Sequence, residues 1–151
     1  MPIATSATAD DSKVAEADRA SRDAAFTLAL TLPGDTLLYL LLPIYAASFG
    51  VTLPEAGFLL AANRLVRIAG YGIVARFYSA SGARAACLLA AFGSILAALI
   101  YATQSGVWAL LVGRLVWGLS FAAMNIANQA LPTSVAAGAA KRSGLSRAII
   151  A

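Results

Sequence analysis

The 151-residue sequence contains no histidine, one cysteine and few charged residues. Without histidine, histidine-based catalysis and histidine ligation of a metal are excluded. Cys87 is alone, so neither a disulfide framework nor a cysteine metal site is expected. The chain also lacks a phosphate-binding glycine loop. These absences predict a protein that is not an enzyme and that needs no cofactor.

Charged residues make up 12% of the chain and hydrophobic residues 60%. Soluble domains carry about 25% charged residues, so this composition indicates an integral membrane protein. The net charge of +4 does not predict nucleic-acid binding, because the basic residues are spread over loops and apolar stretches. The lipid bilayer is the expected partner, and nucleic acid is not.

Four apolar stretches are long enough to cross a bilayer. A hydrocarbon core about 30 Å thick needs roughly 20 apolar residues in a helix. We therefore predict an all-α membrane protein with four transmembrane helices and the start of a fifth. The expected spans cover residues 24–49, 55–77, 83–103 and 107–130.

The segments outside these spans are polar or basic. Residues 1–23 mix acidic and basic side chains, which predicts a disordered cytoplasmic tail rather than a secretory signal. Residues 131–143 follow as a basic cytoplasmic loop. Residues 144–151 are expected to begin a truncated fifth helix, and the alternative is a short amphipathic tail on the membrane surface.

The distribution of Lys and Arg outside the spans predicts the orientation. The turns after the first and third spans contain no Lys or Arg. The basic residues outside the spans, together with Arg76 and Arg84 at the span ends that flank the second loop, lie on the other side: Lys13, Arg19, Arg22, Arg76, Arg84, Lys141, Arg142 and Arg147. By the positive-inside rule, the N-terminus is expected in the cytoplasm and the spans in the plasma (inner) membrane.

Four charged residues lie in the interior of the predicted spans, away from the span ends: Asp35, Arg64, Arg67 and Arg114. Each such charge costs about 2.5–3.5 kcal/mol on insertion scales and persists mainly in a bundle interior or a wet cavity. Three arginines against one aspartate leave a positive excess, which favours a substrate or ion pathway over a purely structural network. For Arg64, nearer the outer side, both interpretations stay open.

Polar residues in three of the spans recur at helical spacing, so each span presents one polar face. The faces are expected to converge on a substrate and proton pathway formed by Asp35, Tyr39, Arg64, Arg67, Tyr71, Arg114 and Asn125. Helical rise places Arg114 roughly 8–9 Å from Asp35 along the membrane normal, so direct pairing would need a tilt, a kink or a bridging water. The third span carries small residues at spacing four, which predicts a packing face.

The fourth span carries the pattern Leu110-x-x-x-Arg114-x-x-Trp117-Gly118-x-Ser120. This pattern resembles the fourth-helix motif of the major facilitator superfamily of secondary transporters, in which a buried arginine precedes a glycine by four residues. Asp35, with the downstream Leu42-Pro43, is similar to elements of that family's first helix. The motif between its second and third helices has a degenerate counterpart here in Gly72, Arg76, Gly82 and Arg84.

The resemblance covers residues 24–151 and implies part of a helical bundle of the major facilitator type. It implies solute movement by alternating access, often coupled to protons, with the chain as an N-terminal fragment that needs the remaining transporter helices. The arginine excess predicts an organic anion as the small-molecule substrate. The alternative is a small four-helix membrane protein that acts as an oligomeric exporter or as a non-catalytic membrane subunit.

Overall fold

The structure is a computed structural model that describes residues 4–151, with side chains from residue 10 onward. Its elements are α1 (Ala4–Ile44), the short 3₁₀ helix η1 (Ala46–Phe49), α2 (Leu53–Thr103), α3 (Val107–Thr133) and α4 (Ala139–Ile150). No strand occurs within this described range. Three helices, α1, α2 and α3, are long and apolar enough to cross a membrane, which agrees with the predicted helical membrane class.

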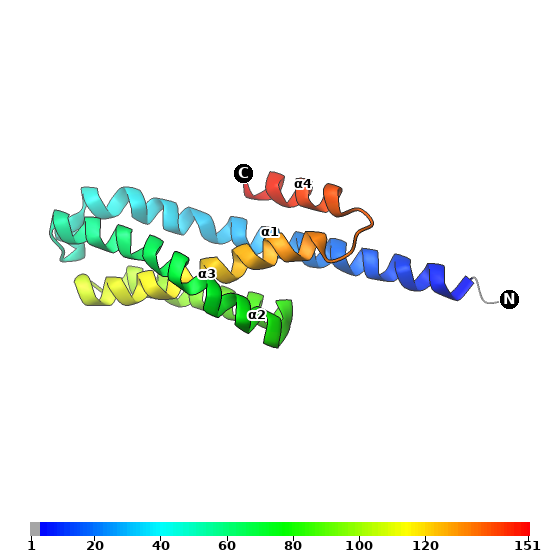
Figure 1. The fold of residues 1–151 in the computed structure, drawn as a ribbon. Helices are drawn as coiled ribbons and strands as arrows, with labels where there is room; N and C mark the ends of the chain where they lie inside the picture. Colours follow the sequence, from blue (N-terminus) through cyan, green and yellow to red (C-terminus); the bar gives the residue numbers. More distant parts are fainter. Residues whose placement is uncertain (1–3) are drawn as a thin grey trace.

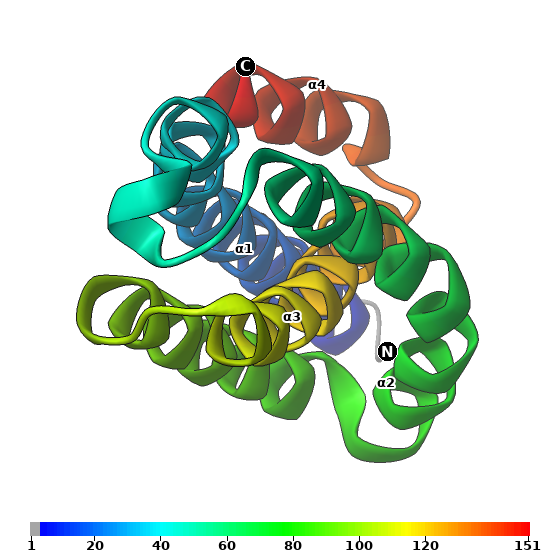
Figure 2. The ribbon, with the colours of Figure 1, turned by 90° about the vertical axis from the view of Figure 1, so that its left-hand side faces the viewer.

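The 51-residue helix α2 consists of two helical segments joined at Gly82. Gly82 has φ 79° and ψ 168°, a conformation that residues with a side chain rarely adopt. The chain turns back at this residue, so residues 53–81 and 83–103 run in opposite directions (Figures 1 and 2). The break expected between the second and third apolar stretches therefore coincides with the non-helical residue of α2.

Two turns meet at the end of the molecule that lies opposite Gly82 (Figure 1). The Gly106 N–H donates a hydrogen bond to the Phe49 carbonyl oxygen at 2.8 Å, which joins the turn before α2 to the turn before α3. A Cβ on Gly50, whose φ is +66°, would lie 3.3 Å from the Gly106 nitrogen. Glycine at position 50 therefore allows both the left-handed backbone conformation and the close approach of the two turns.

Helix α3 runs through the middle of the bundle (Figure 2). Within its most apolar stretch of 18 residues, 50% of the residues are buried, compared with 22% in the corresponding stretches of α1 and α2. At Gly118, the glycine of the predicted motif, α3 packs closely against the first segment of α2. A Cβ at Gly118 would lie 3.0 Å from Asn63 Oδ1, 3.1 Å from Val66 Cγ1 and 3.4 Å from the Asn63 backbone oxygen. The absence of a side chain at residue 118 thus sets how near the two helices lie.

The small residues of the third stretch form part of the packing face that the sequence predicts. Ala86, Ala90 and Ser94 are buried, but the buried face continues at Ala97, and Ala98 is exposed. An α-helix has 3.6 residues per turn, so residues spaced by four move gradually around its surface. A single step of three residues, from Ser94 to Ala97, returns to the buried face.

The outside of the long helices is apolar. Large hydrophobic side chains are exposed there, among them Leu30, Ile68, Phe92 and Trp108, which are 80%, 74%, 71% and 80% exposed. Soluble monomers rarely expose so much apolar surface, because its hydration is unfavourable. This surface fits contact with lipid or with further helices.

The N-terminal segment differs from the expected disordered tail. Residues 1–3 lie outside the described range, and α1 is helical from Ala4 onward. Ala17, Ser21 and Ala24 are buried at helical spacing, and Asp18 pairs with Arg142 at 3.1 Å. The polar segment is therefore held in a helix by contacts with a part of the chain that is distant in sequence.

The C-terminal segment also differs from the expected loop over residues 131–143. Helix α3 continues to Thr133, and α4 begins at Ala139, five residues before the expected start at residue 144. Arg142, which is 4% exposed, donates hydrogen bonds to the carbonyl oxygens of Pro132 at 3.0 Å, Ala137 at 2.8 Å and Val135. These bonds satisfy carbonyls in the last turn of α3 and just after it, and α4 lies back along α1 and α3 (Figure 1).

The arrangement of turns predicts the topology. In a Cys87→Ser background, Ser105→Cys should react with an impermeant maleimide from outside intact cells, whereas Ser81→Cys should react only after the membrane is opened. The reason is that the two turns lie at opposite ends of the helices and that the basic residues flank the Ser81 end. The parent Cys87 protein is the control, and labelling of both positions from the same side would contradict the arrangement.

The contact at Gly118 predicts a packing defect. Gly118→Val should lower the free energy of unfolding by about 1–3 kcal/mol, because the new side chain forces α3 away from Asn63 and Val66. Gly57→Val is the matched control, since nothing lies within 4 Å of a Cβ at Gly57. Unfolding by sodium dodecyl sulfate in mixed micelles, followed by circular dichroism, measures both. Equal destabilisation by the two substitutions would show that Gly118 does not limit the helix contact.

Candidate functional site

Three charged residues from three helices meet in one ion cluster, formed by Asp35 of α1, Arg67 of α2 and Arg114 of α3. Arg114 Nη1 donates to Asp35 Oδ1 at 2.6 Å, and Arg67 Nη2 donates to Asp35 Oδ2 at 3.1 Å. The side chains of Arg114, Asp35 and Arg67 are 0%, 8% and 23% exposed. The cluster is therefore a buried site with two cations and one anion.

Asp35 and Arg114 are bonded directly, so the water that the helical rise suggested as a bridge between them is not required. The long Arg114 side chain reaches the carboxylate without an intervening group. Arg67 pairs with the other carboxylate oxygen at the same time. Asp35 therefore pairs with both arginines in this structure.

Aromatic rings surround the two guanidinium groups. The Arg67 guanidinium carbon lies 3.6 Å from the centroid of the Phe121 ring, and that of Arg114 lies 4.8 Å from Tyr39 and 5.7 Å from Tyr101. Rings within about 6 Å attract a cation through their quadrupole. These rings therefore stabilise the two guanidinium charges.

Tyr39 is held in place by two polar contacts with α2. Its hydroxyl donates to the Leu60 carbonyl oxygen at 3.5 Å and accepts from Asn63 Nδ2 at 3.3 Å. Tyr39, which the sequence places on the polar face of its span, thus packs against the ion cluster. Tyr101 was not expected, although it lies seven residues after Ser94, a spacing that puts both on one helix face.

The cluster retains unused hydrogen-bonding capacity. Among the described residues, Arg114 Nε and Nη2, Arg67 Nε and the Tyr101 hydroxyl are buried and have no hydrogen-bond partner. A buried donor without a partner costs about 1–3 kcal/mol, and more when it is charged. The geometry therefore leaves donors available for an additional acceptor.

The remaining residues of the expected pathway fall into two groups. Tyr71 lies near the cluster, and its hydroxyl accepts a hydrogen bond from Asn125 Nδ2 at 2.6 Å, which joins α2 to α3. Arg64 is exposed and forms no hydrogen bond or ion pair with any described residue, so it lies apart from Asp35. The residues of the expected loop motif are all exposed on α2: Gly72, Arg76, Gly82 and Arg84.

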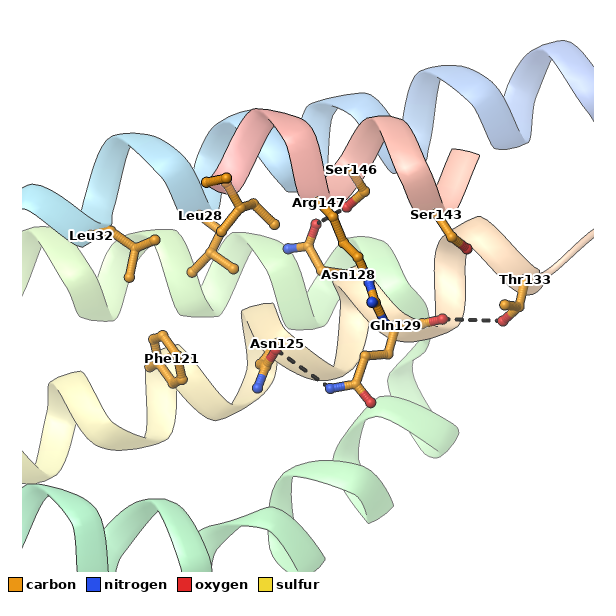
Figure 3. Close-up of a pocket in the computed structure, with 12 residues that line it drawn as sticks. Leu28, Leu32, Phe121, Asn125, Asn128, Gln129, Thr133, Ser143, Ser146 and Arg147 are labelled. Carbon is orange, nitrogen blue, oxygen red and sulfur yellow. Dashed lines mark hydrogen bonds between the residues drawn. The ribbon is translucent and has the colours of Figure 1, made fainter. Parts of the chain in front are cut away.

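A cavity of about 700 Å³ lies between α1, α3 and α4 (Figure 3). Amide, hydroxyl and guanidinium side chains line much of it: Asn125, Asn128, Gln129, Ser143, Ser146 and Arg147. Ser146 donates to Asn128 Oδ1 at 3.2 Å, which connects α4 to α3. Phe121 lines the cavity as well as stacking on Arg67, so one side chain lies between the cavity and the ion cluster.

Comparisons of the chain with protein-family models, curated protein sequences and solved structures find no match. A functional argument therefore depends on the geometry and charge of the site itself. Within residues 4–151, no group of three or more Asp, Glu, Cys or His residues is placed to hold a metal ion. The chemistry that the cluster's geometry offers is the recognition of charge.

The shared carboxylate predicts a large loss of stability when it is neutralised. Asp35→Asn should lower the free energy of unfolding by about 3–5 kcal/mol, because two guanidinium groups are left without their counter-ion. The double variant Asp35→Asn/Arg114→Gln should recover part of this loss by removing the fully buried cation. Unfolding in mixed micelles at constant pH measures both effects.

Arg64→Gln is the matched control for these variants, because it removes an exposed arginine that has no partner among the described residues. It should change the free energy of unfolding by less than about 0.5 kcal/mol. If Asp35→Asn were no more destabilising than Arg64→Gln, the ion cluster would not hold the three helices together.

Proposed function

We propose that the chain is part of a secondary transporter of the major facilitator type, which moves an organic anion in step with protons through a four-span portion of its bundle. The observation that carries this proposal is the buried cluster in which one carboxylate is shared by two arginines from different helices. The fourth-helix motif supports the family, since Arg114 is fully buried and Gly118 lies in close helix contact.

The charge of the cluster favours an anionic substrate. Asp35 neutralises one of its two arginine partners, so the buried group carries a net charge of +1. Guanidinium groups stay protonated and present forked donors that match a carboxylate or phosphate. Because Arg114 Nε and Nη2 and Arg67 Nε have no partner within the described chain, an anion would add both charge and hydrogen-bond acceptors.

Asp35 gives the proposed site a means of coupling to protons. Protonation removes the negative charge that Arg67 and Arg114 share, so the cluster becomes more positive and attracts an anion more strongly. Binding free energies are reciprocal, so a bound anion also favours protonation of Asp35. Proton and anion are then taken up together, which is the behaviour of a symporter.

The same charge balance argues against an oligomeric multidrug exporter. Small exporters of that kind use an embedded acid to attract cations, which requires a carboxylate with negative charge to spare. Here, both carboxylate oxygens of Asp35 already accept hydrogen bonds from guanidinium groups. A non-catalytic membrane subunit has no comparable reason to keep a buried positive excess.

The proposal predicts a charge preference that depends on Arg67. In lipid nanodiscs, the protein should bind 3-phenylpropionate more tightly than the matched neutral 3-phenylpropionamide or the cationic 3-phenylpropylamine. Arg67→Gln should weaken binding of the anion about tenfold or more, since a charge-assisted hydrogen bond is lost. Arg19→Gln, which removes an exposed arginine in the N-terminal part of α1, is the control for net charge.

Isothermal titration in buffers of different ionisation enthalpy should also detect proton uptake on anion binding, and Asp35→Asn should abolish that uptake. Counterflow of 3-phenylpropanesulfonate in proteoliposomes then tests transport itself, because this acid does not cross bilayers in a neutral form. Tighter binding of the amine by the wild type, with no effect of Arg67→Gln on the anion, would refute the proposal.

A further inference from the structure

The cavity between α1, α3 and α4 has two chemically different ends (Figure 3). Leu28, Leu32 and Phe121 form an apolar end, and the amides of Asn128 and Gln129 lie towards the other end. Its volume of about 700 Å³ falls within the roughly 300–1,000 Å³ that small-molecule sites occupy. These walls fit a molecule with an apolar body and a polar head.

Arg147 is the one charged side chain that lines this cavity. It extends from α4 across the space towards Gln129 of α3 (Figure 3), and it has no hydrogen bond or ion pair with any described residue. The neighbouring Arg142 differs, because its guanidinium is committed to Asp18 and to three backbone carbonyls. Arg147 is therefore the cation whose donors are available to a molecule in the cavity.

Phe121 connects the cavity to the ion cluster. Its ring lines the apolar end of the cavity, and the Arg67 guanidinium lies 3.6 Å from the ring centroid. An anion at Arg147 and an anion at Arg67 would thus contact the same side chain from two directions.

We infer that this cavity is a second anion-binding position, in which Arg147 holds the carboxylate of an amphipathic monoanion while its apolar or aromatic body packs against Leu28, Leu32 and Phe121. This inference rests on the proposed function and deepens it, since it names the class of substrate and a residue that selects it. Arg147 receives the anion in the cavity, and Arg67 receives it at the ion cluster. The apolar end selects against small hydrophilic anions.

Equilibrium binding in nanodiscs tests the inference, with 3-phenylpropionate as the probe. Arg147→Gln should weaken binding about tenfold to a hundredfold, whereas Arg147→Lys should keep a substantial part of the affinity because it keeps the charge. Arg19→Gln should leave the affinity within about twofold of the wild type. Propionate, which lacks the aromatic body, should bind at least about tenfold more weakly than the probe.

The outcomes separate this inference from the proposed function. If Arg67→Gln abolishes binding of 3-phenylpropionate and Arg147→Gln leaves it unchanged, the second position is refuted and the proposed function stands. If the wild type does not prefer the anion to its amide, the proposed function itself fails. Arg147 is exposed, so Arg147→Gln is expected to fold, and its elution in size-exclusion chromatography checks that it does.

Discussion

The carboxylate of Asp35 is the interaction on which the arrangement of the three long helices depends. Each of its oxygens accepts a hydrogen bond from an arginine on a different helix. A shift of α1 by one residue would rotate the carboxylate by about 100° and leave both guanidinium groups buried without a counter-ion. Gly118, one turn from Arg114, permits the close contact with α2 that brings Arg67 within reach of the same acid.

Much of this site could be predicted from helical periodicity, and the limits of that prediction are physical. The embedded charges identified Asp35, Arg67 and Arg114, because buried charges inside apolar helices rarely occur without a partner. The exposure of Arg64 could not be predicted, because Arg64 and Arg67 are three residues apart and share a broad helix face. Only the rotation of α2 within the bundle determines that Arg67 faces Asp35 and Arg64 does not. Tyr101 was missed because small residues around it indicate packing, although a ring can face a cation from a packing face.

The ends of the chain were harder to predict than its apolar centre, because long-range contacts determine them. The mixed charges of residues 10–23 resemble those of a solvated tail, yet Asp18 pairs with Arg142, 124 residues away. Arg142 in turn satisfies backbone carbonyls in the last turn of α3 and just after it, and α4 starts earlier than composition indicates. Local propensity contains no information on such contacts, whereas the apolar stretches are fixed by length and hydropathy alone.

The positive excess of the cluster connects stability with the proposed function. A structural tie between helices needs one arginine for one acid, and a second buried arginine adds desolvation cost without a second counter-ion. An arriving anion would offset that cost, so the same unbalanced charge that destabilises the empty site would supply its affinity. Functional sites commonly retain such locally unfavourable features. The cavity beside Phe121 extends this logic outward, because the Arg147 side chain lines it and has no ion pair with any described residue.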